Sequence, residues 1–312
     1  MTYYPLKVGK NKMEKLLITL LLAAVLLIAA AEHIGAQTTH TAALPDKTYA
    51  VKGIRFTMKG ITAVTGAVLG DTGRSDNQEH TVDLSAYYIG ETEVTQELWQ
   101  AVMGHNPSHY DGSQNREPAK GEAQGKRPVE NVTWFDCIVF CNELTKKLNG
   151  GTDTDCVYTI DGIPYTREDA NAEKTPVQDI GKKGFRLPTE AEWEWAAMGG
   201  TDTENDLDND AWYADNSNKK THQVKLKSAN GYGLYDMIGN VWEWCWNWYD
   251  GNTPDWEQIN PKGADSGSDR VNRGGSWYDV AYYAARAYRF HDLPNERSRY
   301  LGLRLICSIG SN

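Results

Sequence analysis

The 312-residue sequence is poor in cysteine, and no cysteine precedes Cys137. A lipid-modified cysteine near the N-terminus is therefore excluded. The cysteines are widely scattered and none forms a C-x-x-C pair, which argues against a zinc ribbon or a dithiol redox motif. We expect one or two disulfides and a buried thiol, with pairings that the sequence leaves open. The five residues are Cys137, Cys141, Cys156, Cys245 and Cys307.

Basic residues are outnumbered. The chain has 32 Lys and Arg against 42 Asp and Glu, which gives a formal net charge of −10. A protein that follows the phosphates of a nucleic acid needs a basic stripe, so we expect no nucleic-acid partner. The same acidity disfavours binding to anionic membrane surfaces.

An apolar run at residues 16–31 follows Lys10, Lys12 and Lys15 and ends in small residues. This is the pattern of a secretory signal. We predict a signal peptide over residues 1–36, cleaved after Ala31 or Ala36. An uncleaved membrane anchor is the alternative, because the run is near the lower length limit for a span. The protein is thus expected to be exported and periplasmic, on the cell surface or secreted, where disulfides can persist.

The remaining chain is predicted as a polar lead-in at residues 37–52 and one domain at residues 53–312. Strands are expected at residues 54–68 and 80–89, where β-branched and aromatic residues gather. Residues 105–126 are expected to be irregular, and residues 151–184 to form an inserted hairpin and loop.

Three helices are indicated by their caps. Thr95 is a natural N-cap for a helix at residues 96–103. Thr133 with Asp136, and Thr189 with Glu192, form the pattern of capping boxes for the second and third helices. The acids Glu190, Glu192 and Glu194 alternate along the third helix, so we interpret them as capping and solvated residues rather than as one catalytic face.

Four tryptophans within seven residues form the most distinctive stretch of the chain. Their period of two predicts a strand with the indoles on one face and Glu243 on the other. A glycine-rich turn precedes this strand. Asp236, Glu243 and the carbonyls of the turn are hard oxygen ligands of the kind that Ca²⁺ prefers. The alternative is a plain glycine turn with its acids facing water. The tryptophans are Trp242, Trp244, Trp246 and Trp248.

Six motifs occur in order along the chain. They are Gly90-Glu-Thr-Glu-Val-Thr95, Arg127-Pro-Val-Glu-Asn-Val-Thr-Trp134, Phe185-Arg-Leu-Pro-Thr-Glu-Ala-Glu-Trp-Glu-Trp195, Gly233-Leu-Tyr-Asp-Met-Ile-Gly-Asn-Val-Trp-Glu-Trp244, Arg273-Gly-Gly-Ser-Trp277 and Leu301-Gly-Leu-Arg304. Together they resemble the formylglycine-generating enzyme (sulfatase-modifying factor) family, and the resemblance covers nearly all of the chain after the signal peptide. It implies a single irregular, loop-rich α+β domain of the formylglycine-generating-enzyme type, related to C-type lectins.

The resemblance also implies a structural Ca²⁺ ion at the turn before the tryptophan strand. The family's ligands correspond here to Asp236, the carbonyls of Gly239 and Val241, and Glu243. Asp236 replaces an amide that is often found at its position, which keeps an oxygen and adds a charge.

The family's oxidases bind Cu(I) with two cysteine thiolates that follow the Gly-Gly-Ser motif, and soft thiolates are what select Cu(I). In this chain no cysteine occurs between Cys245 and Cys307, and Asp279 stands where the first thiolate would be. The serine of the motif corresponds to Ser276. We therefore expect no copper, no catalytic residues of the known kind and no oxidase activity, although another enzymatic chemistry stays open. Lone histidines such as His222 and His291 are interpreted as polar loop residues.

The segment after Ser276 is rich in the residues that binding surfaces use, namely tyrosine with Asp, Asn, Ser and His. The alternative is an ordinary segment with buried rings. Arg286, Arg289 and Arg297 are expected to hold its loops through carboxylates and carbonyls. The predicted ligand-binding residues are Tyr278, Asp279, Tyr282, Tyr283, Tyr288, Phe290, His291 and Asp292.

These observations predict an exported, non-catalytic ligand-binding protein whose ligand is a protein or a glycan. The segment resembles the variable region of proteins that are diversified by retroelements, some of which use this fold for display. Two alternatives stay open. One is an enzyme, either an oxidase of the formylglycine-generating type or one of unrecognised chemistry. The other is an accessory protein of the cell envelope.

Overall fold

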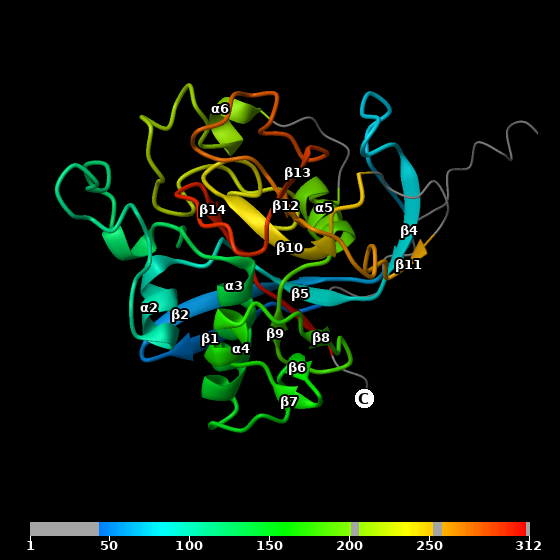
Figure 1. Cartoon of the computed structure of the whole chain (residues 1–312). Coiled ribbons are helices and arrows are strands. Elements are labelled where there is room, and N and C mark those ends of the chain that lie inside the picture. The colour runs from blue at the N-terminus through cyan, green and yellow to red at the C-terminus, as the bar shows by residue number, and fades with distance from the viewer. Residues whose placement is uncertain (1–43, 201–205, 252–257, 310–312) are drawn as a thin grey trace, which may run out of the picture. The chain divides into compact units, whose positions relative to one another are not determined.

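The structure is a computed structural model and describes residues 44–200, 206–251 and 258–309. The predicted signal peptide and the first part of the predicted lead-in lie outside these residues. Within the described ranges, no helix is both long and apolar enough to cross a membrane. Short helices and strands are mixed along the chain and joined by long loops, as predicted for an irregular α+β domain (Figure 1).

Two sheets form the frame of the domain, one with strand order β1-β2-β5-β15-β9 and the other with order β13-β12-β10-β14. Strands that are distant in the sequence are neighbours in both sheets, so long-range contacts hold the domain together. The first sheet consists of β1 (Lys47–Val51), β2 (Ile54–Ile61), β5 (Tyr87–Gly90), β9 (Phe185–Arg186) and β15 (Ile306–Ser308), and the second of β10 (Trp242–Trp248), β12 (Arg270–Arg273), β13 (Arg289–Asp292) and β14 (Leu301–Gly302).

Two smaller sheets have the orders β11-β4-β3 and β7-β6-β8. The second of these is the inserted hairpin that the sequence predicts between residues 151 and 184. Residues 80–89, which we expected to be one strand, are divided between two sheets, because the chain leaves β4 at Leu84 and enters β5 at Tyr87. The strands are β3 (Val64–Leu69), β4 (His80–Leu84), β6 (Tyr158–Ile160), β7 (Ile163–Pro164), β8 (Val177–Gln178) and β11 (Gln258–Ile259).

The three predicted helices are confirmed as α2 (Gln96–Met103), α3 (Trp134–Leu148) and α5 (Glu190–Met198). The side chain of Thr95 caps α2. Both predicted capping boxes are formed at the starts of α3 and α5, where they satisfy backbone N–H groups that have no partner within the helix. Three shorter helices are α4 (Arg167–Asn171), α6 (Leu207–Asp210) and the 3₁₀ helix η1 (Gln124–Lys126).

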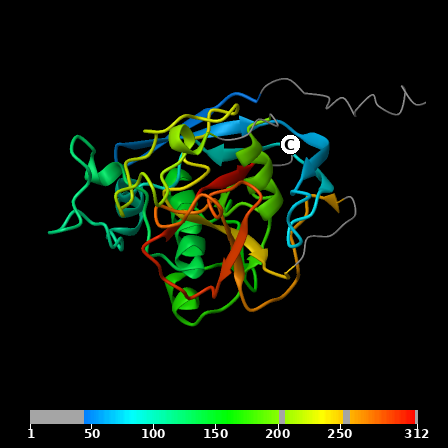
Figure 2. The same ribbon diagram turned by 90° about the horizontal axis from the view of Figure 1, so that it is seen from above.

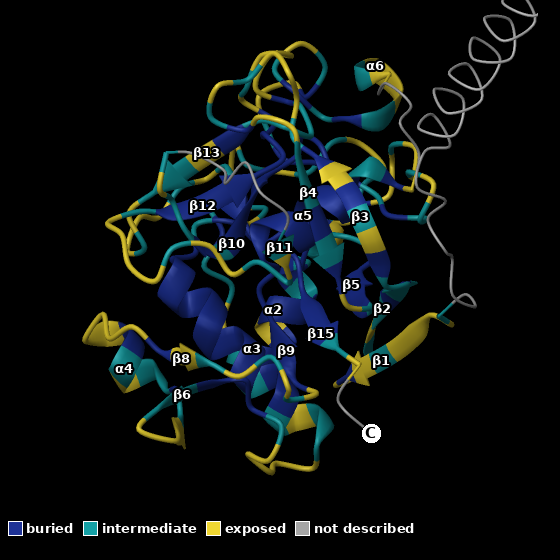
Figure 3. Ribbon diagram, turned by 90° about the vertical axis from the view of Figure 1, so that its right-hand side faces the viewer, coloured by how far each residue is buried: buried dark blue, intermediate teal, exposed yellow. Residues whose placement is uncertain are grey.

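Strand β10 lies between two hydrophobic clusters. Trp242 and Trp244 belong to the cluster around α3, whereas Cys245 belongs to the cluster around α5. Helix α3 packs against β1 and β9, and α5 packs against β3, β10 and β12 (Figures 1 and 2). Both helices are buried along most of their length (Figure 3). The predicted alternation of the tryptophan strand is therefore confirmed, and it separates the two clusters.

The predicted lead-in contains a strand of the domain. Strand β1 pairs with β2 over its whole length, from Lys47 opposite Met58 to Val51 opposite Ile54. The ring of Tyr49 stacks on that of Phe56, with centroids 5.5 Å apart. The domain therefore begins before residue 53. An edge strand whose outward side chains are polar has a polar composition, which is why the sequence suggested a linker.

The expected disulfides are not formed. All five cysteines fall within the described ranges, and all are buried free thiols. Burial is the largest cause that raises the pKa of each of them, to about 11 for Cys156 and Cys307. These cysteines behave as small apolar side chains of the core.

We predict that Gly302→Ala destabilises the protein by about 1–3 kcal/mol, the usual penalty for overpacking. A Cβ atom at Gly302 would approach the Val129 carbonyl oxygen to 2.3 Å, and that oxygen belongs to buried backbone. Gly73→Ala is the control, because there the nearest atom is the mobile carboxylate of Asp71, at 3.2 Å. Equal unfolding free energies for the two variants in a denaturant titration would contradict the predicted close packing.

Candidate functional site

The segment that follows β12 turns sharply on two glycines. Gly274 and Gly275 have φ values of 99° and 77°, which are rarely adopted by residues with a side chain. A Cβ on Gly275 would come within 2.9 Å of the Cα of Ala284, so the chain also needs the absence of a side chain there. The segment folds back at residues 276–288 and returns as β13, which pairs with β12. We call residues 276–292 the display segment.

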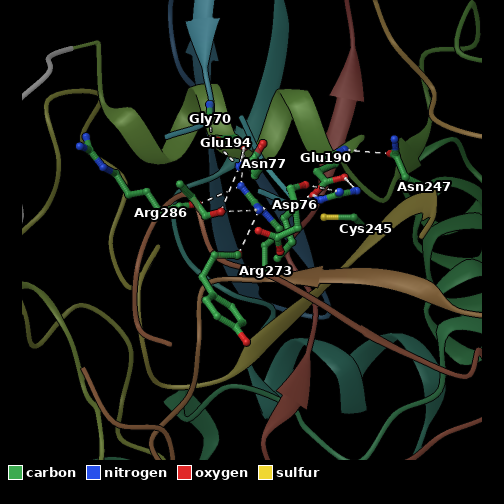
Figure 4. A network of polar contacts seen from close by, with 12 residues as sticks. Gly70, Asp76, Asn77, Glu190, Glu194, Cys245, Asn247, Arg273 and Arg286 are labelled. Carbon is green, nitrogen blue, oxygen red and sulfur yellow. Dashed lines mark hydrogen bonds and ion pairs between the residues drawn. The ribbon is translucent and has the colours of Figure 1, made fainter. Parts of the chain in front are cut away.

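Helix α5 holds the display segment through a buried ion pair (Figure 4). Arg273 donates from Nη2 to the Glu194 carboxylate at 2.5 Å, and neither residue is more than 3% exposed. The same guanidinium donates to the backbone carbonyls of Arg286 and Tyr288, at 2.9 and 3.0 Å. Asn77 donates both to Glu194 and to the carbonyl of Ala287, at 3.0 Å. The conformation of residues 286–288 is therefore set by groups buried beneath them.

A second ion pair lies one helical turn away. Arg289 binds Glu190 with two hydrogen bonds of 2.6 and 2.9 Å and donates to the carbonyl of Asp76. Burial opposes ionisation of Glu190, but Arg289 and Arg273 together hold the pKa of its carboxyl below the usual value. The expectation of solvated acids on α5 is thus wrong. Glu190 and Glu194 are four residues apart, share one face of the helix and are both buried.

Of the three arginines expected to hold the loops, two do so with their side chains. Arg289 is described above, and Arg297 pairs with Asp136 at 2.7 Å. Arg286 contributes through its backbone carbonyl, while its side chain points away from the glutamates (Figure 4).

Four of the predicted binding residues present exposed rings. Tyr278 is 60% exposed, Tyr282 65%, Tyr283 38% and Phe290 38%. The expectation that these rings face solvent is confirmed. Their role in binding stays a prediction.

The display segment forms one continuous group of rings around Trp242. Tyr282, Tyr283 and Tyr288 contact one another with centroids 5.0–5.6 Å apart. The indole of Trp242 lies 6.0 Å from the ring of Tyr288 and 5.4 Å from that of Phe290. Its Nε1 donates to Asp279 Oδ2 at 2.9 Å. Burial raises the pKa of Asp279, which also accepts a hydrogen bond from Ser276.

Tyr278 and Asp292 lie apart from this group, whereas His291 meets it through a stack on Phe290, with ring centroids 5.7 Å apart. Tyr278 stacks on Tyr300, with ring centroids 6.2 Å apart. His291 has Asp269 as its partner at 2.8 Å and stacks on Tyr249, on the side of β13 to which Arg289 also points. Asp292 accepts from Asn272 at 2.9 Å, and burial raises its pKa to about 6.

Sequence reasoning missed Trp242 and Arg74 as parts of this surface. The period of two assigned Trp242 to the core, which is correct for most of its ring, but its N–H reaches Asp279. Arg74 comes from the loop between β3 and β4 and lies over the rings of Tyr282 and Tyr288. No local signal in the sequence connects residue 74 with residues 282 and 288.

Cys245 lies in β10 between buried side chains, and burial holds its pKa well above the ordinary value. A protonated, buried thiol is a poor nucleophile and a poor metal ligand. The absence of copper and of the oxidase chemistry stays a prediction.

Asp236, in the turn before β10, fits a calcium ligand. The side chain is buried, and its Oδ2 accepts from the backbone N–H of Lys225 at 2.8 Å. Its Oδ1 has no hydrogen-bond partner among the described residues. A carboxylate oxygen of this kind suits Ca²⁺, which takes oxygen ligands.

Glu243, the other charged ligand that the sequence predicts, is already engaged. Its carboxylate accepts from Arg304 Nη2 at 2.8 Å and from Trp193 Nε1 at 2.6 Å. It would therefore share its oxygens between Arg304 and a Ca²⁺ ion. In the described part of the chain no group of three or more His, Cys, Asp or Glu side chains is arranged to hold a metal. Calcium binding through Asp236, Glu243 and the carbonyls of Gly239 and Val241 stays a prediction.

We predict that Glu194→Gln destabilises the protein by about 1.5–3 kcal/mol, the usual value of a hydrogen bond to a charged group, because Arg273 loses its shortest ion pair and keeps only Glu190, at 3.4 Å, as an acidic neighbour. Hydrogen exchange at residues 286–288 should accelerate, since the carbonyls there are held by the same guanidinium. Glu192→Gln is the matched control: it breaks the buried pair of Glu192 with Arg186, whose guanidinium contacts no carbonyl of the display segment. Equal acceleration at residues 286–288 in both variants would refute this role of Glu194.

For calcium, we expect excess chelator to lower the melting temperature and added Ca²⁺ to restore it, because a ligand that binds only the folded state stabilises it. Asp236→Asn keeps the shape of the side chain and removes its charge, so the response to chelator should shrink. A melting temperature that excess chelator leaves unchanged would show that the turn holds no stabilising ion.

Proteins similar to this chain in sequence and in structure are known. The chain is similar over 95% of its length to the chaperone protein LppX of Paenibacillus barcinonensis, with 33% identity and complete coverage of that protein. It is 36% identical to the formylglycine-generating enzyme of Bos taurus over 66% of this chain, and it spans about half of that enzyme's length.

The structure is similar to that of Treponema denticola variable protein 1, with 52% sequence identity and a TM-score of 0.75. The match covers 85% of this chain and 99% of that one. The family model described as the sulfatase-modifying factor enzyme 1-like domain matches residues 37–309. The chain therefore belongs to the sulfatase-modifying factor enzyme 1-like family, and its fold is that of the formylglycine-generating enzymes.

Proposed function

We propose that this protein is an exported, non-catalytic binding protein that uses the display segment to contact its ligand. The observation that carries the proposal is the combination of four exposed rings with a backbone held by two buried ion pairs. Exposed aromatic rings that lie close together are characteristic of interaction sites on soluble proteins.

The physical advantage of this arrangement is preorganisation. Tyrosine has few rotatable bonds, so it offers a large contact area for little loss of entropy on binding. The ion pairs of Arg273 and Arg289 fix the backbone before a ligand arrives, which lowers the cost of ordering the loop. The hydroxyls and the half-buried Asp279 and Asp292 add groups that form hydrogen bonds.

The relatives favour a display function. Treponema denticola variable protein 1 is named as a variable protein, and it shares about half of its residues with this chain. We propose that the display segment is a variable region, diversified by a retroelement. A reverse-transcriptase gene and a second copy of the stretch that encodes residues 273–304, both close to this gene, would support this. The ligand is a protein or a glycan. The chaperone name of LppX favours a protein, since a chaperone's ligand is a polypeptide.

An oxidase is the alternative function. Formylglycine-generating enzymes are relatives of this chain, so the alternative has to be tested directly. We expect that incubation with Cu(I), O₂ and a cysteine-containing sulfatase peptide leaves the mass of the peptide unchanged. Formation of the aldehyde would disprove the non-catalytic proposal.

We predict that Tyr278→Ala and Tyr282→Ala each change the unfolding free energy by less than about 1 kcal/mol, because both rings are mostly exposed. Trp277→Ala is the buried comparison at 2% exposure and should cost about 3–5 kcal/mol. The two tyrosine variants should lose binding to an array of glycans and cell-surface proteins that the wild-type protein recognises. If both bind the array as the wild type does, the ligand surface lies elsewhere.

A further inference from the structure

The side chain of Arg74 lies over the rings of Tyr282 and Tyr288, which come from a distant part of the chain. Its guanidinium carbon lies 4.7 Å from the ring centroid of Tyr288 and 5.1 Å from that of Tyr282. One of its N–H groups also donates to the carbonyl oxygen of Tyr282, at 3.4 Å. A cation within about 6 Å of an aromatic centroid is attracted by the negative face of the ring.

The three rings pack edge to face against one another. Tyr282 and Tyr283 meet at 78°, Tyr282 and Tyr288 at 73°, and Tyr283 and Tyr288 at 86°. In such edge-on contacts the positive edge of one ring meets the face of another, so the cluster supports itself. Tyr282 still exposes 65% of its surface, which leaves room for a further group beside its ring.

The loop that carries Arg74 and the segment that carries the rings are held by the same buried groups, Glu194 and Arg273. The loop that carries Arg74 is held at both ends by Glu194, which accepts from the backbone N–H of Gly70 and from the side chain of Asn77. Glu194 also pairs with Arg273, which holds the carbonyl of Tyr288. Between its two ends the loop is largely exposed, so Arg74 reaches the rings with its side chain while its backbone stays at the surface.

We propose that the cluster of Tyr282, Tyr283 and Tyr288 is a guanidinium-binding site, and that Arg74 fills it until a partner protein inserts an arginine of its own. This deepens the proposed function and rests on it, because it names the chemistry of the partner. A guanidinium suits the site better than an ammonium, since it is planar, stacks on rings and is more weakly hydrated. The net charge of −10 attracts basic partners, and arginine and tyrosine are frequent in the centres of interfaces.

The test uses the full-length chain and N-acetylarginine amide as the probe, with the neutral isostere N-acetylcitrulline amide beside it. Binding is followed through the NMR signals of the tyrosine rings. Arg74→Gln removes the internal competitor, so the variant should bind the arginine probe about two- to fivefold more tightly than the wild type does, the factor expected for losing one exposed cation–π contact. Tyr282→Leu, made in the Arg74→Gln protein, should lose this gain. The citrulline probe should bind neither protein.

Two matched controls make the result specific. Arg55→Gln removes an exposed arginine elsewhere and should bind the probe as the wild type does. Tyr235→Leu removes a ring that is also covered by a cation, Lys225 at 4.8 Å, and should have no effect. The proposal is overturned if Arg74→Gln binds no better than Arg55→Gln, if citrulline binds as well as arginine, or if Tyr235→Leu acts like Tyr282→Leu.

The experiments distinguish a failure of the guanidinium site from a failure of the proposed binding function. Suppose that the protein recognises a partner on the array through the display segment, but that Arg74→Gln binds the arginine probe no more tightly than the wild type does. Only the guanidinium site is then refuted. If the arginine probe binds at Tyr282 but no array member depends on Tyr278 or Tyr282, the site stands and the proposed function fails.

Discussion

The display segment and the loop of residues 70–77 both depend on the ion pair between Arg273 and Glu194. Both groups are buried, and a buried charge is costly without a partner of opposite charge. Arg273 has five N–H donors, and the ion pair does not use all of them. Other N–H groups of the same guanidinium hold carbonyls of the display segment, while Glu194 also accepts from Gly70 and Asn77 at the ends of the loop of residues 70–77. One carboxylate thus positions two surface loops that are more than a hundred residues apart in the sequence.

The ion pair between Arg304 and Glu243, which lies at β10, performs a similar task. Arg304 meets Glu243 at 2.8 Å and also donates to the carbonyls of Gly90, Tyr235 and Asp236. It therefore joins β5 and the turn before β10 to the last part of the chain. Arg273 and Arg304 follow the same principle: a planar cation with several donors pairs with a buried acid and uses its other N–H groups to organise irregular backbone. A domain with few long helices or strands needs such devices, because its loops lack the regular hydrogen bonding of those elements.

The side chains that stabilise the fold are different from those that the display segment exposes. The tryptophans, the leucines and the buried ion pairs supply the core, whereas the exposed rings of the display segment contribute little to it. Side chains on that surface can then differ between related proteins without loss of the fold. The buried thiols fit the same picture, since they fill the core and offer no reactive group at the surface.

The local elements could be predicted from neighbouring residues in the sequence alone. Capping residues placed the starts of α2, α3 and α5, the period of two placed β10, and the ordered motifs indicated the family. Each of these signals lies within a few neighbouring residues, where side chains act directly on their own backbone. The sequence also led us to expect exposed rings in the display segment, and four of the five predicted tyrosine and phenylalanine rings are exposed, whereas Tyr288 is half-buried.

Only the tertiary structure decided which distant groups meet. Glu190 and Glu194 look like solvated acids on a short helix until β12 and β13 bring Arg273 and Arg289 against them. Asn77 and Arg74 join the display segment across about two hundred residues, and β1 is a strand only because β2 pairs with it. That the five thiols are buried and unpaired is also visible only in the fold. These outcomes depend on pairing over long sequence separations, and no local pattern encodes the partner.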